Sequence, residues 1–225
     1  MSGGNESLAL VIFDCDGVLV DSEPVANRVV AASLTELGWP MTPAESQQRF
    51  LGQALPDMRP MVASRLGEGL AARWAAEVAE RVAEAMLTEA EAVPGAHAAV
   101  AAVEARGLPW RVASNSSHAE LAAKLGRIGL DAAGRVHSFE DVPRGKPAPD
   151  LFLAAAAAEG VAPGACLVVE DSLVGIAGAR AAGMRVVALV RHGEDGGHRQ
   201  AGARVIRDLE ELPTMIEAAA DRNWR

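Results

Sequence analysis

Long hydrophobic runs are missing from this sequence of 225 residues. No apolar run approaches the roughly 18 to 20 residues that a membrane-spanning helix needs, so we expect no membrane span. The segment from Met1 to Leu8 is polar and acidic, whereas a secretory signal begins with basic residues and continues with apolar ones. We therefore expect a cytoplasmic protein with no membrane partner.

Cysteine and lysine are both scarce. Cys15 and Cys166 are too few for a zinc site or a disulfide framework, and both lie in strand-like apolar runs, which favours inert buried thiols. Lys124 and Lys146 are the two lysines, against 19 arginines. Each lysine is therefore more noticeable than it would be in an average chain.

Excess basic charge is also missing. The net charge is -9 and the lysines and arginines form no cluster, so we expect no nucleic-acid partner.

Half of the residues are hydrophobic and 23% are charged, a balance that argues against intrinsic disorder. The length suits one sizeable core with a small accessory domain. Because no heptad pattern is sustained, we expect a monomer.

Short β-branched runs alternate with helical stretches, mainly from Pro94 onward. The predicted strands are Leu8–Phe13, Trp110–Ala113, Arg135–Phe139, Cys166–Val169, Arg185–Val190 and Arg204–Ile206. This alternation is typical of a parallel sheet with helices on its faces, so we predict an α/β fold.

Residues 21–92 break that alternation, because they contain no convincing strand. Apolar side chains repeat there at helical spacing, as in Trp74, Val78, Val82 and Met86. Glycines and prolines divide the segment into roughly four helices. We interpret it as a small all-helical domain inserted after the first strand, with residues 1–20 and 93–225 forming the α/β core domain.

Four short segments place unusual polar residues directly after four of the predicted strands or the turns that follow them. They are Asp14-Cys15-Asp16-Gly17-Val18, Ser114-Asn115, Gly145-Lys146-Pro147 and Glu170-Asp171-Ser172. In open parallel α/β sheets, ligands bind at the carboxyl ends of the strands. We therefore expect the four segments to meet at one edge of the sheet and to form a site.

The acidic residues in these segments favour a divalent cation. Asp14 and Asp16 point to the same side if the chain stays extended, and their repulsion is costly without a cation or a shared proton. Glu170 and Asp171 follow a strand that is buried by its pattern, where unpaired acids are also costly. Mg²⁺ prefers oxygen ligands of this kind. The alternative is that the acids are solvent-facing loop residues.

Ser114 and Lys146 are suited to an anionic ligand. A serine at a strand end is able to hydrogen-bond an anion together with the amides of the following helix. The alternative is that this segment has only a structural role, in which Ser116 or Ser117 caps the helix that begins near His118. Lys146 offers a positive charge for a phosphate or an aspartate, and its alternative is an ordinary surface lysine.

Taken in order, the four segments resemble the haloacid dehalogenase-like hydrolase superfamily. The resemblance extends from Leu8 to about Leu212. The helical insert is similar to the branch with an α-helical cap after the first strand, which includes β-phosphoglucomutases and phosphoglycolate phosphatase-like phosphatases. The resemblance implies a Rossmann-like core and a Mg²⁺-dependent phosphatase. Its substrate would be a small phosphate ester, either a sugar phosphate or a phospho-acid.

The resemblance also implies a role for each site residue. Asp14 would be the nucleophile that forms an aspartyl-phosphate, and Asp16 the general acid and then the base. Ser114 and Asn115 would bind the phosphoryl oxygens, and Lys146 would offset negative charge. The implied Mg²⁺ ligands are Asp14, Asp16 through its backbone carbonyl, Asp171 and Glu170.

Two other activities of the family fit less well. Dehalogenases lack the second acid, so Asp16 disfavours dehalogenation. β-Phosphoglucomutases carry a cap histidine soon after the first segment and a lysine farther along the cap. Here Pro24-Val25-Ala26-Asn27 contains no histidine, and Leu51 stands in place of the lysine. We therefore predict hydrolysis, with a sugar phosphomutase as the alternative.

The sequence determines less clearly which residues contact the substrate and what role His192 and His198 have. Arg49 and Gln53 are candidates for substrate contacts near Gly52, and their alternative is an ordinary helix surface. A non-catalytic binding module is disfavoured because the catalytic acids and Lys146 are all present. We expect His192 and His198 to lie in a solvated loop rather than to bind a metal.

Overall fold

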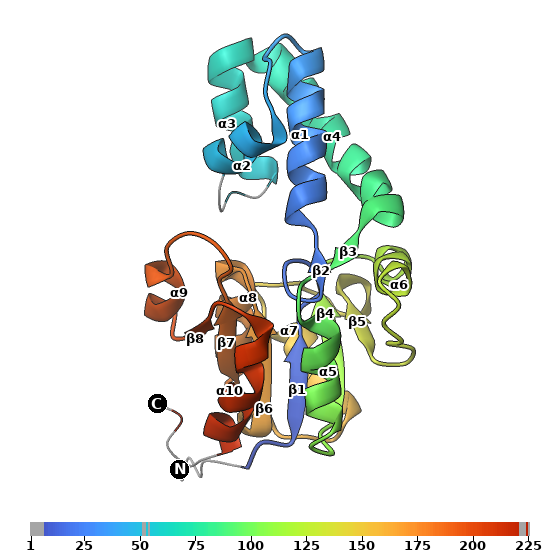
Figure 1. Cartoon of the computed structure of the whole chain (residues 1–225), viewed down its shortest axis with the longest axis vertical. Helices are drawn as coiled ribbons and strands as arrows, with labels where there is room; N and C mark the ends of the chain where they lie inside the picture. The colour runs from blue at the N-terminus through green and yellow to red at the C-terminus, as the bar shows by residue number, and fades with distance from the viewer. Residues whose placement is uncertain (1–6, 51–52, 54, 221–223, 225) are drawn as a thin grey trace. The chain divides into compact units, whose positions relative to one another are not determined.

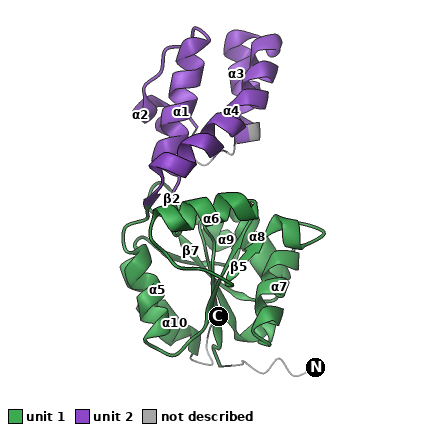
Figure 2. Ribbon diagram, turned by 90° about the vertical axis from the view of Figure 1, so that its right-hand side faces the viewer, with its two compact units in different colours: residues 1–20, 92–225 green, residues 21–91 purple. Residues whose placement is uncertain are grey.

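The computed structural model describes residues 7–50, 53, 55–220 and 224 (Figure 1). The chain divides into two compact units, one made of residues 1–20 and 92–225 and the other of residues 21–91 (Figure 2). The two passages between the units pair with each other as a two-stranded sheet of β2 (Val20–Asp21) and β3 (Glu91–Ala92). These strands are too short to leave a period in the sequence, and they were not predicted.

The larger unit is built on a six-stranded parallel sheet, as predicted. Its strand order is β5-β4-β1-β6-β7-β8. The strands are β1 (Leu10–Phe13), β4 (Trp110–Ser114), β5 (Val136–Ser138), β6 (Cys166–Glu170), β7 (Arg185–Leu189) and β8 (Arg204–Ile206). All residues of β1, β6 and β7 are buried, which explains their continuous apolar pattern, since a central parallel strand is covered on both faces.

Helices cover both faces of this sheet. They are α5 (Ala96–Glu104), α6 (His118–Arg127), α7 (Asp150–Ala158), α8 (Leu173–Ala181), α9 (Gly196–Gln200) and α10 (Leu212–Ala220), with 3₁₀ turns η1 (Phe139–Asp141), η2 (Pro163–Ala165) and η3 (Leu209–Glu211). The pair α5 and α10 lies on one face and the pair α7 and α8 on the other (Figure 2). Phe152 of α7 and Ile176 of α8 pack on Ile12 and Val168 in a continuous apolar core.

In its described residues, the smaller unit is an insert of four helices after β1, which confirms the predicted helical insertion. Its helices are α1 (Glu23–Glu36), α2 (Pro43–Arg49), α3 (Leu55–Leu66) and α4 (Glu68–Glu89). They share a core in which Trp74 is buried, and the Trp74 Nε1–H donates to Ser33 Oγ at 2.8 Å. Among the helices in the described ranges, none combines the length and the apolarity that a membrane crossing requires.

The arrangement of the sheet explains where polar side chains can gather. β1 lies between β4 and β6, and the three strands run parallel, with Ile12 opposite both Arg111 and Val168. Their carboxyl ends therefore open at one edge of the sheet. The chain passes from β1 to β4 through α5 on one face of the sheet, whereas it reaches β6 from β5 through α7 on the other face (Figure 2). Open α/β sheets bind ligands at such a position, where the strand order changes direction.

Candidate active site

Four side chains from separate segments lie at this edge of the sheet. Asp14 follows β1 directly, Ser114 ends β4, Glu170 ends β6, and Lys146 lies in the turn between η1 and α7. All four are buried, although each is polar. Burying polar groups is costly unless they are paired, so their mutual contacts decide what this edge can do.

Lys146 links two of the carboxylates. Its Nζ lies 2.5 Å from Asp14 Oδ1 and 2.6 Å from Glu170 Oε1. Burial opposes the charge of Lys146, but the carboxylates of Asp14 and Glu170 outweigh that effect and raise its pKa. The ammonium therefore stays charged at any physiological pH. The alternative of an ordinary surface lysine is excluded for this position, because Lys146 is buried.

Glu170 is fully buried, and both of its carboxylate oxygens have partners. Oε1 accepts from Lys146, while Oε2 accepts from the backbone N–H of Asp171 at 3.0 Å, from that of Ser172 at 2.9 Å and from Ser172 Oγ at 2.9 Å. A charged acceptor with several donors is well stabilised even in a buried position. Glu170 therefore holds both Lys146 and the loop that carries Asp171.

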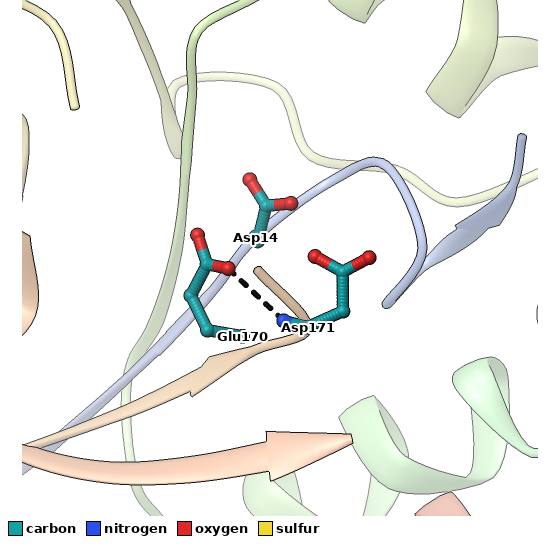
Figure 3. Close-up of side chains that lie close together, drawn as sticks. All are labelled: Asp14, Glu170 and Asp171. Carbon is teal, nitrogen blue, oxygen red and sulfur yellow. Dashed lines mark hydrogen bonds between the residues drawn. The ribbon is translucent and has the colours of Figure 1, made fainter. Parts of the chain in front are cut away.

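Asp14, Glu170 and Asp171 bring carboxylate oxygens within 4.8 Å of one another, an arrangement able to hold a metal ion (Figure 3). Burial, together with the charge of Glu170, raises the pKa of Asp14 to about 7 against the opposing effect of Lys146. Burial and the charges of Glu170 and Asp14 likewise raise the pKa of Asp171 well above its usual value. The cluster therefore carries more negative charge than Lys146 offsets, and it is suited to a hard cation.

The Asp16 side chain contacts different residues from those that contact Asp14. Its two oxygens each lie 2.9 Å from Lys124 Nζ of α6, and Ser116 Oγ donates to Oδ2 at 3.1 Å. Burial opposes the charge of Lys124, but the carboxylate of Asp16 prevails and raises the pKa of Lys124. Neither Lys124 nor Ser116 was predicted as a site residue, and Ser116 was considered only as a cap of the helix that begins near His118. The scarcity of lysine was the signal that could have found Lys124.

Ser114 and Asn115 occupy different environments. Ser114 is buried, and its Oγ accepts from the backbone N–H of Ser116 at 3.1 Å. Asn115 uses its amide on the backbone of Lys146: Oδ1 accepts from its N–H at 2.9 Å and Nδ2 donates to its carbonyl at 3.1 Å. Asn115 thus fixes the turn that carries Lys146. Ser117, one of the two predicted caps, caps α6 through a capping box with Glu120.

The two candidate substrate residues of the helical unit have local partners. Arg49 ends α2, with its guanidinium 5.3 Å from the centre of the Trp39 ring. The backbone N–H of Gln53 donates to the carbonyl of Phe50 at 2.9 Å. Leu51, which stands where the mutases carry a lysine, and Gly52 lie outside the described residues.

The predictions for Cys15, His198 and His192 have different outcomes. Cys15 is buried, as expected, and burial raises the pKa of its thiol, which is consistent with an inert residue. The solvated-loop prediction for His198 is wrong, because the loop contains α9 and His198 is partly buried there with its Nε2 2.9 Å from the backbone carbonyl of Asp171. His192 is exposed, as expected.

Two glycines leave the space that these carboxylates occupy. A Cβ on Gly17, where φ is +79°, would overlap the Asp171 carboxylate, and a Cβ on Gly175 in the first turn of α8 would overlap that of Glu170. Both positions therefore require the absence of a side chain.

We expect Gly175→Ala to destabilise the protein by about 2 kcal/mol or more, since overpacking a buried position costs about 1–3 kcal/mol and here displaces the partner of Lys146. Turnover should fall with it. The matched control is Gly126→Ala in α6, where a Cβ meets nothing within 4 Å and helix propensity favours alanine. Chemical denaturation of both variants checks the prediction, and equal stabilities would contradict it.

Comparison with known proteins gives a consistent family. A family model described as haloacid dehalogenase-like hydrolase matches residues 8–183. The chain is 34% identical to hexitol phosphatase A of Escherichia coli over 182 residues, which covers 79% of this chain and 81% of that protein. It is also 34% identical to 6-phosphogluconate phosphatase of Escherichia coli over 179 residues, or 78% and 80% of the two chains.

A solved structure supports the same grouping. A haloacid dehalogenase family hydrolase from Deinococcus radiodurans superimposes with a TM-score of 0.80 and 32% sequence identity, over 95% of this chain and 96% of that one. That protein was crystallised with bound phosphate and sodium.

Proposed function

Because the chain belongs to the haloacid dehalogenase-like hydrolases and is a hydrolase of phosphoric monoesters, we propose that it is a Mg²⁺-dependent phosphatase of a sugar phosphate or a sugar-acid phosphate. The observation that carries the proposal is the buried Asp14 carboxylate, held against Lys146 at a strand end beside Asp171. The named relatives act on a hexitol phosphate and on 6-phosphogluconate, which supports this substrate class.

The residues at the edge of the sheet fit a magnesium ion. We place it on Asp14, Asp171 and the backbone carbonyl of Asp16, because these groups supply hard oxygen donors in a cluster that is short of positive charge. Glu170 lies in the same cluster, but its oxygens already accept four hydrogen bonds, so we assign it to holding Lys146 and the Asp171 loop. When bound, Mg²⁺ supplies positive charge that lets a phosphate dianion approach a carboxylate.

Each of the site residues then has its own role in the reaction. Asp14 attacks phosphorus and forms an aspartyl-phosphate, while the bond from phosphorus to the ester oxygen breaks. The proton of Asp16 passes to that oxygen, and Asp16 then takes a proton from the water that hydrolyses the aspartyl-phosphate. Lys146 and the hydroxyl of Ser114 stabilise the charge on the phosphoryl oxygens. Asn115 contributes by fixing the backbone of Lys146.

We assign substrate choice to the helical unit, residues 21–91, as the cap domain of this branch. Arg49 and Gln53 remain our candidates for contacts with the part of the substrate that does not react. Asn27, in the segment without a histidine, is occupied by local bonds: Nδ2 donates to the carbonyl of Glu23 and Oδ1 accepts from Ser46 Oγ. This supports hydrolysis over phosphoryl transfer within a sugar.

The test is phosphate release from a panel of esters, with Mg²⁺ and with a chelator. The panel contains hexitol phosphates, 6-phosphogluconate, phosphoglycolate and p-nitrophenyl phosphate. We expect Mg²⁺-dependent release, fastest with a hexitol phosphate or with 6-phosphogluconate. Release from none of these esters would contradict the proposal. Interconversion of sugar phosphates that depends on a bisphosphate would support the mutase instead.

We expect Mg²⁺ to stabilise the folded protein in the absence of substrate. At about ten times its Kd, a ligand of the native state contributes about 1.4 kcal/mol, which raises Tm by roughly 3–6 °C for a chain of this size. The shift should be larger at about pH 8 than at about pH 6, because Asp14 has a pKa of about 7 and protons occupy it below that value.

Thermal unfolding at the two pH values measures this effect. Asp171→Asn is the matched variant, and it should lose most of the shift. An unchanged Tm of the wild-type protein at both pH values would contradict the proposed metal site.

A further inference from the structure

The second acid of the Asp14-Cys15-Asp16 segment is held by two side chains to which the proposed function gives no role, Lys124 and Ser116. Lys124 Nζ lies 2.9 Å from each oxygen of Asp16 and 3.2 Å from Ser116 Oγ. Ser116 in turn donates to Asp16 Oδ2 at 3.1 Å. The Asp16 carboxylate therefore has two donors, and both come from the segment that follows β4.

Burial distinguishes this contact from a surface ion pair. The side chain of Lys124 is 7% exposed, whereas that of Asp16 is 31% exposed. A buried ammonium with a fixed partner loses little to solvent competition, while exposed pairs contribute little. Lys124 is therefore able to fix the Asp16 carboxylate while the Asp16 side chain stays partly exposed.

The use of lysine in the chain points to the same conclusion. The sequence has 19 arginines and two lysines, and the two lysines contact the two aspartates of one segment: Lys146 contacts Asp14 and Lys124 contacts Asp16. An ammonium is a compact charge with rotatable donors, whereas a guanidinium is a wide planar fork. Both lysines are buried, and a compact cation is suited to such positions.

We propose that Lys124, with Ser116, is a positioning residue that fixes the Asp16 carboxylate for its proton transfers. This rests on the proposed function, in which Asp16 protonates the leaving oxygen. Asp16 gains negative charge as its proton moves to that oxygen and the bond to phosphorus breaks. The Lys124 ammonium already faces both carboxylate oxygens, so it stabilises this charge without having to move.

The leaving group of the substrate provides a test that a purely structural role would not pass. p-Nitrophenolate departs without a proton, whereas the alkoxide of a hexitol phosphate needs one. General acid catalysis contributes about 10²–10⁴-fold. We therefore expect Lys124→Met to lower kcat/KM for a hexitol phosphate by about 100-fold and for p-nitrophenyl phosphate by less than about 5-fold.

Three further variants complete the experiment. Arg127→Met removes a charge of the same sign from the exposed side of α6 and should leave both substrates unaffected. Lys124→Arg should recover part of the loss with the hexitol phosphate, and Ser116→Ala should show a weaker loss of the same selectivity. Phenyl phosphate, with an intermediate leaving group, should fall between the two substrates.

The outcomes separate this inference from the proposed function. If the wild-type protein hydrolyses neither substrate, the proposed function fails. If the wild type is active but Lys124→Met loses both substrates equally, keeps both or gains activity, the positioning role is wrong. Thermal unfolding of each variant identifies a fold that has been lost. If Lys124→Met does not fold, Ser116→Ala provides the test. A larger loss with the hexitol phosphate than with p-nitrophenyl phosphate supports the proposal, and an equal loss with both substrates overturns it.

Discussion

Asp14→Asn should lower turnover of every ester by about 10⁴-fold or more, because an amide oxygen does not form the aspartyl-phosphate and removing a nucleophile costs several orders of magnitude. The side chain keeps its size and lies in a buried position, so the fold should be preserved. Burial raises the pKa of Asp14 to about 7, so above that pH the native state holds a charge that its surroundings disfavour. The variant should therefore be at least as stable as the wild type at about pH 8.

Steady-state phosphate release and thermal unfolding measure both parts of this expectation. Acid quenching during turnover should recover phosphate bound to the wild-type protein and none bound to the variant. Asp57→Asn, at an exposed position of α3, makes the same chemical change away from the site and should keep full activity. Substantial turnover by Asp14→Asn would remove Asp14 from the role of nucleophile.

Lys146→Met should reduce both stability and activity. The substitution removes the cation that lies 2.5 Å from Asp14 and 2.6 Å from Glu170, and Glu170 is fully buried. Breaking a buried ion pair from one side costs about 3–5 kcal/mol, which lowers Tm by roughly 10 °C for a chain of this size. Turnover should fall by about 10³-fold, because the phosphoryl group loses a fixed positive charge.

A double variant distinguishes the two effects. Lys146→Met combined with Glu170→Gln removes the orphaned carboxylate as well, so it should recover part of the stability and none of the turnover. Denaturant unfolding of the wild type, both single variants and the double variant gives the coupling between the two side chains. A Lys146→Met protein as stable as the wild type would contradict the structural role of this ion pair.

Those elements and site residues that have a signal in the neighbouring sequence could be predicted. The apolar runs of β1, β6 and β7 are continuous because these strands are buried on both faces, so the sequence locates them and with them the parallel sheet. Asp14 and Lys146 were identified because each stands beside a feature with a local signal. These features are a strand end for Asp14 and a turn between glycine and proline for Lys146.

The contacts that the sequence did not predict depend on which groups meet across the fold. Glu170 and Asp171 are neighbours of the same charge, yet the first turns inward to Lys146 and the second lies against Gly17. Lys124 is 108 residues from Asp16 and meets it because β4 and β1 are adjacent in the sheet. Strand order does not follow from local periodicity, so no residue next to Lys124 in the sequence indicates its contact with Asp16.

The paired strands β2 and β3 make the helical unit separable in principle. The chain leaves the larger unit at Val20 and returns at Ala92, and these two points lie on neighbouring strands of one small sheet. A short turn that joined them would bypass residues 21–91 without interrupting any of the six strands. In genetic terms the insert has the layout of a cassette, because its two junctions with the larger unit are adjacent. Under the proposed assignment of substrate choice to the helical unit, replacement of this one segment would change the substrate range and leave the sheet edge with Asp14 and Lys146 as it is.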